Sequence, residues 1–160
     1  MTTLFQAGQQ LRKVRGWIFI SLACAAGCLW AGIVLAQTSG LNPGDGGELD
    51  PLPERLAWGG GVAMLGIGFA AAMWLYGRCY VATINLDKQT QNLHIDTVRL
   101  FGRAEHVFKV SDILRCRYYG GRFDGVNAPW RSVKMKGRWL PFLIDEQGQL
   151  LERKLMNKLF

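Results

Sequence analysis

Two long runs without a charged residue place the strongest constraint on the fold of this 160-residue chain. Residues 17–36 read WIFISLACAAGCLWAGIVLA, and residues 57–77 read AWGGGVAMLGIGFAAAMWLYG. A helix needs about 20 mostly apolar residues to cross about 30 Å of hydrocarbon, and neither run has the polar face of a water-soluble helix. The alternative is a pair of buried helices in a soluble protein, but so short a chain could hardly enclose them. The sequence therefore predicts two membrane spans.

The charges are distributed in a way that orients this hairpin. Residues 1–16 carry three basic residues and no acid, whereas residues 37–56 carry four acids and one arginine. Residues 78–160 carry 15 basic and 8 acidic residues. Because Lys and Arg near span ends stay on the inner side, we expect both termini on the cytoplasmic or matrix side of the membrane. A bacterial inner-membrane protein with cytoplasmic termini would show the same asymmetry. The acidic loop then faces outward.

Both spans are rich in small residues at helical spacing. Helices in lipid gain no hydrophobic energy from pairing, so small residues favour association by letting the backbones approach closely. We expect the two spans to pack on each other and to leave a surface for a helix of another protein. The residues expected to make these contacts are Gly27, Ala31, Gly32, Gly59, Ala63 and Gly68.

The pattern of apolar residues changes after the second run. Segments such as YVATINL, LHIDTVRLFG, HVFKV and ILRCRYY are typical of strands, and residues 151–159 have apolar side chains at helical spacing. The predicted fold class is a membrane α-helical hairpin followed by a small α+β domain, with an antiparallel sheet of about five or six strands and a C-terminal helix. The predicted domains are a basic segment, residues 1–16, the hairpin, residues 17–77, with its acidic Gly/Pro loop at residues 37–56, and a basic β-rich domain, residues 78–160.

No motif for catalysis or cofactor binding stands out in the sequence. A nucleophile motif, a P-loop and a Rossmann turn are lacking, and GGGVAMLGIG lies inside a span, where glycine serves packing. His94 and His106 have no partners at metal-ligand spacing, and Cys24 and Cys28 have no histidine or carboxylate beside them in their span. We therefore predict a protein that is not an enzyme, with no catalytic residue, cofactor or metal.

Basic and aromatic residues alternate in the last third of the chain. This composition suits anionic lipid headgroups, an acidic protein neighbour, or RNA bound through phosphates and stacked bases; a solvated face is the remaining interpretation. The tether to a span favours lipid or protein, and nucleic acid is the weaker expectation. The residues expected to bind a partner or lipid are Arg115, Arg117, Arg131, Lys134, Lys136, Arg138 and Trp139.

Residues 132–160, SVKMKGRWLPFLIDEQGQLLERKLMNKLF, resemble the C-terminal segment of the mitochondrial transmembrane protein 223 family. In that family a basic K-x-K-G-R strand leads into an aromatic and apolar strand, which ends in Asp and a glycine turn before a helix rich in Lys and Leu. LFGRAEHVF at residues 100–108 and the first span are similar to the same family.

The resemblance implies a two-span protein of the mitochondrial inner membrane with both termini in the matrix. It implies a non-catalytic accessory subunit or assembly factor of a respiratory-chain complex, above all cytochrome c oxidase or a supercomplex that contains it. The expected partners are membrane-embedded subunits of that complex and an anionic lipid such as cardiolipin. The alternative is a biogenesis factor that contacts mitochondrial RNA, the ribosome or nascent membrane subunits.

Overall fold

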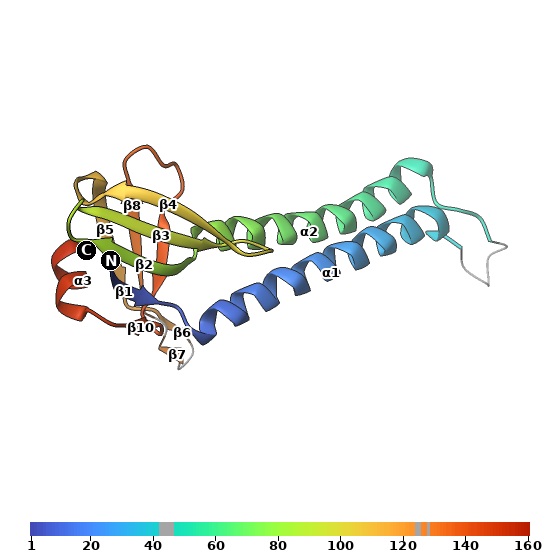
Figure 1. Ribbon diagram of the computed structural model, residues 1–160. Coiled ribbons are helices and arrows are strands. Elements are labelled where there is room, and N and C mark those ends of the chain that lie inside the picture. Colours follow the sequence, from blue (N-terminus) through green and yellow to red (C-terminus); the bar gives the residue numbers. More distant parts are fainter. Residues whose placement is uncertain (42–46, 124–125, 128) are drawn as a thin grey trace. The chain divides into compact units, whose positions relative to one another are not determined.

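The computed structural model describes residues 1–41, 47–123, 126–127 and 129–160. Residues 42–46, which include Asp45 of the predicted acidic loop, lie outside the described residues. The chain forms two compact units. One unit consists of Met1–Gly16 together with Leu75–Phe160, and the other is Trp17–Trp74. Figure 1 shows the order of the helices and strands along the chain.

Two helices contain the uncharged runs. Helix α1 spans Gln9–Thr38 and helix α2 spans Leu52–Cys79, and both are long and apolar enough to cross a membrane. Large apolar side chains project from both, as in Trp30 and Leu65, which are 69% and 74% exposed. In water such exposure would be costly, whereas in hydrocarbon it is not. Both helices extend beyond the uncharged runs at their charged ends.

The ends of the two helices follow from local chemistry. Helix α1 stops before Gly40, whose φ of +90° is the left-handed conformation that commonly ends a helix. The Ser39 hydroxyl then donates a hydrogen bond to the Asp50 carboxylate at 2.7 Å. Helix α2 begins just after Pro51, whose carbonyl accepts hydrogen bonds from the backbone of Glu54 and Arg55. A proline is tolerated there because the first turn of a helix does not need its N–H group.

The sheet region holds ten strands within the described residues. The first sheet contains β1 (Thr2–Gln6), β2 (Val81–Asp87), β3 (Asn92–Val98), β4 (Arg103–Lys109) and β10 (Gln149–Leu150), in the order β10-β1-β2-β3-β4. The second contains β5 (Ile113–Tyr119), β8 (Trp130–Met135) and β9 (Phe142–Asp145), in the order β5-β8-β9. A short pair is formed by β6 (Arg122–Phe123) and β7 (Val126–Asn127).

Two helical turns complete this unit. The 3-10 turn η1 spans Val110–Asp112, and the C-terminal helix α3 spans Arg153–Leu159. All pairings between the strands are antiparallel, and an isolated parallel bridge joins Tyr80 to Leu143. The predicted fold class is confirmed, since two long apolar helices are followed by a small antiparallel sheet region and a C-terminal helix. The structure divides this region into more strands than the five or six expected, and β6, β7 and β10 are only two residues long.

Side chains from both larger sheets share one core. Leu93 and Ile95 of β3 and Val133 and Met135 of β8 are at most 1% exposed. The ring of Phe142 on β9 meets the rings of His106 and Phe108 on β4, with centroids 5.7 and 5.8 Å apart. Met156 of α3 is fully buried as well. Burial of this apolar surface is the main source of stability in the unit.

Strand β1 also belongs to this core, although its residues fall in the predicted basic N-terminal segment, residues 1–16. Leu4 and Phe5 are both 0% exposed, although neighbouring residues of a regular strand point to opposite faces. The register of the pairing with β2 shifts between Thr3 and Phe5, so the alternation is broken at a β-bulge. A Cβ atom on Gly148 would lie 2.6 Å from the Phe5 ring, so this close approach requires glycine.

Candidate functional site

The small residues of the hairpin unit bring the two helices into close backbone contact. A Cβ atom on Gly32 would lie 2.5 Å from the Gly59 carbonyl oxygen and 3.3 Å from the Ala63 Cβ. A Cβ atom on Gly66 would lie 2.5 Å from the Cys28 Cβ. These contacts require glycine, as expected where small residues let two helices approach closely in lipid.

The structure brings together only part of the predicted packing set. It places Gly32, Gly59 and Ala63 at the contact, and it adds Gly66, which was not in that set. Among the described residues, no atom outside the local helix backbone lies within 4 Å of the position that a Cβ would take on Gly27 or Gly68. Those two glycines therefore face away from the contact within the hairpin.

The predicted basic residues are divided between the two faces of the β5–β8 pair. Arg115 lies opposite Lys134 in the register, and Arg117 lies opposite Ser132, so these side chains share one face. The opposite face carries Val133, which is fully buried, and Arg131. The strands thus hold Arg115, Arg117 and Lys134 as one exposed basic row above the core.

This row lines a surface cavity of about 240 Å³, which we name the strand groove. Among its lining residues are Arg115, Arg117, Tyr119, Lys134 and Trp139. Trp139 is 87% exposed. Three cations beside exposed aromatic rings can bind a carboxylate or a phosphate, and the rings can stack on a flat apolar group.

Two of the predicted basic residues lie elsewhere. The Arg131 Nε donates a hydrogen bond to the Glu146 carboxylate at 2.5 Å, and one of its Nη atoms donates to Asn157 at 2.9 Å. Arg131 is thus paired and only 16% exposed at its side chain, so it serves the fold. Lys136 is exposed in the turn after β8, where its backbone N–H donates to the Asp112 carbonyl at 2.8 Å.

Arg138 belongs to a second cavity, of about 310 Å³, which we name the arginine pocket. Arg78 from the end of α2 and Arg99 from the β3–β4 connection also line it, as do His106, Trp139 and Leu75. The three arginines come from distant points of the chain, so the run of basic residues in the last third of the sequence does not include Arg78 and Arg99. Trp139 lines both cavities and lies between them.

Arg138 is held firmly in the arginine pocket. Its guanidinium carbon lies 3.6 Å from the centre of the Phe142 ring, and its Nη2 donates a hydrogen bond to the Arg78 carbonyl at 2.7 Å. Its Nη1 is buried and has no hydrogen-bond partner among the described residues. A guanidinium has five N–H donors, so Arg138 retains unused capacity to bind an oxygen ligand. Burial, and then the charge of Arg78, lower the pKa of Arg138 from its ordinary value.

The pKa of His106 is lowered both by burial and by the positive charge of the arginine pocket. Its pKa is lowered by partial burial first, and then by the charges of Arg138, Arg99 and Arg78, with Asp96 acting in the opposite direction. The imidazole Nε2 lies 3.3 Å from the hydroxyl oxygen of the buried Thr97. The charges of three arginines give the pocket a positive potential, which favours an anion.

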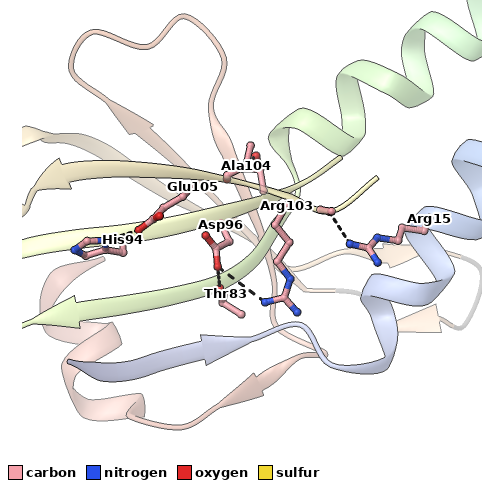
Figure 2. Close-up of polar contacts among 9 residues, drawn as sticks. Arg15, Thr83, His94, Asp96, Arg103, Ala104 and Glu105 are labelled. Atoms are coloured by element: carbon pink, nitrogen blue, oxygen red, sulfur yellow. Dashed lines mark hydrogen bonds and ion pairs between the residues drawn. The ribbon is translucent and has the colours of Figure 1, made fainter. Parts of the chain in front are cut away.

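Other polar groups of the β3–β4 hairpin are paired with each other or with residues of β2 and α1, as Figure 2 shows. The Thr83 hydroxyl donates to the Asp96 carboxylate at 2.5 Å, and Arg103 lies 4.0 Å from the same carboxylate. The Arg15 side chain donates to the Gly102 carbonyl at 2.6 Å. His94 lies 2.7 Å from the Glu105 carboxylate. Arg15 and Arg103 are therefore committed to protein acceptors.

Comparison with known protein families finds a match over most of this chain. A family model described as the TMEM70/TMEM186/TMEM223 protein family matches residues 44–160. The matched segment contains helix α2 and all strands from β2 to β10. No curated protein matches the chain.

Proposed function

Since the chain belongs to the TMEM70/TMEM186/TMEM223 protein family and is a membrane protein, we propose that it assists the assembly of a mitochondrial respiratory-chain complex or remains in that complex as an accessory subunit. The observation that carries this proposal is the family match over residues 44–160, which agrees with the resemblance of residues 132–160 and 100–108 to the protein 223 branch. The complex is cytochrome c oxidase or a supercomplex that contains it. The protein is not an enzyme, and its work is adhesion.

We further propose that the protein lies in the mitochondrial inner membrane with both termini in the matrix. The pairing of β1 with β2 and β10 supports a common side for the termini, because β1 precedes the first span and its partners follow the second. A sheet cannot form across a bilayer, so these strands must meet in one aqueous compartment. The excess of Lys and Arg in residues 1–16 and 78–160 favours the matrix as that compartment.

The strand groove is the surface we propose for docking on a partner subunit. Arg115, Arg117 and Lys134 form a basic row that has no acidic partner among the described residues, and Trp139 offers a large exposed ring beside it. Arginine and tryptophan are frequent anchors in protein interfaces, and a basic row selects an acidic partner surface. Gly27 and Gly68 are among the hairpin glycines that face no neighbour within the described residues, and they are suited to a partner's transmembrane helix.

The docking role is tested by charge removal at the strand groove. In cells that lack the protein, one expresses the variant Arg115→Gln/Arg117→Gln/Lys134→Gln and, as control, Lys88→Gln/Arg153→Gln/Lys154→Gln. Both variants lose three cations at exposed positions of the same unit. We expect the groove variant to reach the membrane normally but to lose most of its co-migration with a large complex on native gels. Normal retention of the groove variant, with full rescue of complex abundance, would refute the docking role.

A second candidate function is binding of mitochondrial RNA, the ribosome or a nascent membrane subunit during biogenesis. The observation in its favour is Trp139, since an exposed ring beside arginines can stack on an unpaired base while the arginines bind phosphate. Ultraviolet crosslinking in intact mitochondria distinguishes the two functions. RNA crosslinked to the wild type but not to Trp139→Ala would support this candidate, and absence of RNA would remove it.

A further inference from the structure

The arginine pocket joins basic residues from distant parts of the chain, so the basic residues of the last strands alone do not indicate it. Its cavity of about 310 Å³ has room for a phosphate group with part of its substituents. Three arginines line it together with no carboxylate among its described lining residues, and Asp96, whose charge acts on His106 from outside that lining, is already bound by Thr83 and Arg103. The positive charge of the pocket is therefore not balanced from within by that carboxylate.

The donors in the pocket suit a phosphate. A guanidinium forms paired hydrogen bonds to two oxygens of one phosphate, which a lysine cannot do. Arg138 has a buried Nη1 with no partner among the described residues, while stacking on Phe142 fixes the plane of its guanidinium. Arg99 is exposed at the rim and adds a second fork of donors. The preorganised Arg138 thus reduces the entropy lost when a ligand binds.

The position of the pocket in the chain selects a lipid as the source of that phosphate. Leu75 and Arg78 both line the pocket and belong to the end of α2, one of the two apolar helices. Arg78 is the first charged residue after the uncharged run, where a span reaches the headgroup layer. Trp139 and Leu140 extend the apolar part of the rim, and an exposed Trp favours the same layer.

We propose that the arginine pocket binds the phosphate group of an anionic glycerophospholipid, with Arg78, Arg99 and Arg138 on the phosphate and Leu75 and Trp139 against the glycerol and acyl carbons. This rests on the proposed function only in taking α2 as a membrane span. The strand groove, on the other side of Trp139, is left to a protein partner. Bound lipid would then fix the unit at the bilayer surface while the groove docks.

The test measures binding of a soluble short-chain lipid to the purified full chain in a non-ionic detergent. The probes are dihexanoyl phosphatidylglycerol, dihexanoyl phosphatidylcholine and inorganic phosphate, and the binding of each is measured by calorimetry. The pocket variant is Arg78→Gln/Arg99→Gln, and the matched control is Arg115→Gln/Arg117→Gln, which removes the same charge from the strand groove. Arg99→Gln alone is a milder variant of an exposed side chain, kept in case the double variant unfolds.

A basic residue beside an anionic headgroup contributes about a fivefold factor in affinity, so the double pocket variant, which loses two such residues, should bind phosphatidylglycerol about 25-fold more weakly. Arg99→Gln alone should lose about fivefold. The groove control should remain within about twofold, and phosphatidylcholine should bind weakly to all forms. An equal loss in the groove control would mean a diffuse basic surface and would overturn the site.

Two further outcomes would reassign the pocket. Inorganic phosphate that binds as tightly as phosphatidylglycerol, through the same arginines, would identify a free phosphate site and overturn the lipid. A pocket variant that keeps its lipid affinity but loses its complex in mitochondria would assign the pocket to a protein. Failure of the assembly function is distinguishable, since loss of co-migration in the groove variant and loss of lipid by the purified pocket variant are separate measurements.

Discussion

The contact between Gly32 and Gly59 allows a quantitative test of how the hairpin is held together. The substitution Gly32→Ala adds a Cβ atom 2.5 Å from the Gly59 carbonyl oxygen, whereas an ordinary van der Waals contact of a Cβ atom is at least 3.4 Å long. Because the obstacle is backbone and not a flexible side chain, the two helices must separate by about 0.9 Å, the difference between those distances. A gap of this size forfeits a quarter to a half of the dispersion energy of each contact across it.

The matched control is Gly27→Ala on the same helix, where the described residues leave nothing within 4 Å of the added Cβ. Alanine is favoured over glycine in a helix by up to about 1 kcal/mol, and this gain is common to both variants. Insertion of a methyl group into a close-packed contact costs about 1–3 kcal/mol. We therefore expect Gly32→Ala to be less stable than Gly27→Ala by about 1–3 kcal/mol.

The assay is titration of the purified full chain with SDS in mixed micelles, followed by tryptophan fluorescence. In a Trp130→Phe/Trp139→Phe background, the four remaining tryptophans all belong to the unit Trp17–Trp74, so the signal reports the hairpin. The free energy of unfolding of each variant is compared in that background. Equal free energies for Gly32→Ala and Gly27→Ala would refute the close backbone contact.

Three further predictions concern the sheet unit of the purified full chain. Phe5→Ala should lower its free energy of unfolding by about 3–5 kcal/mol, because the ring is fully buried, whereas Met1→Ala at an exposed position should change it little; a loss below about 1 kcal/mol for Phe5→Ala would exclude β1 from the core. Glu146→Gln should cost about 2 kcal/mol in denaturant titrations by leaving Arg131 without its carboxylate, and adding Arg131→Gln should recover part of this loss; additive costs would show that the pair does not interact. His106 has a lowered pKa in the folded state, so the unfolded state binds more protons, and stability should fall as pH drops below about 6.5 toward that lowered pKa. His106→Gln should remove this part of the pH dependence, with thermal unfolding between pH 5 and 7.5 as the measurement and an unchanged slope as the contrary result. Burial is the largest cause of the lowered pKa, followed by the charges of Arg138, Arg99 and Arg78, while Asp96 acts in the opposite direction.

The hairpin could be predicted from the sequence because its signal is local and continuous. About 20 residues without charge admit few other structures, and the structure has a helix over each run. The C-terminal helix could be predicted for a similar reason, since Leu155, Met156 and Leu159 recur at helical spacing. Strand β5 was predicted with the residues that the structure gives it, Ile113–Tyr119.

Strand β1 could not be predicted, because its partners are distant and its pattern is irregular. Thr2–Gln6 contains only two large apolar residues, Leu4 and Phe5, and a bulge buries both although they are adjacent. Its partners β2 and β10 lie on the far side of both apolar helices in the sequence. Only the assembled sheet shows that residues 2–6 belong with the C-terminal domain.

The candidate sites were predictable only where their residues are neighbours in sequence. Arg115 and Arg117 alternate along one strand, so their shared face follows from the strand period, whereas Lys134 joins that face through the register between β5 and β8. Arg131 has the same charge but a different partner, Glu146, which strand alternation alone does not identify. The arginine pocket joins Arg78, Arg99 and Arg138 by tertiary packing, and these three lie far apart in the sequence.

Adhesion to a membrane complex is tested most directly on the unmodified protein in its own membranes. Mitochondrial membranes are solubilised in a mild detergent, separated on a native gel, and each slice is analysed by mass spectrometry. The protein should migrate with a respiratory-chain complex or its assembly intermediates, with cytochrome c oxidase subunits in the same slices. Migration as a free monomer, at every detergent concentration that leaves those complexes intact, would contradict adhesion as its function.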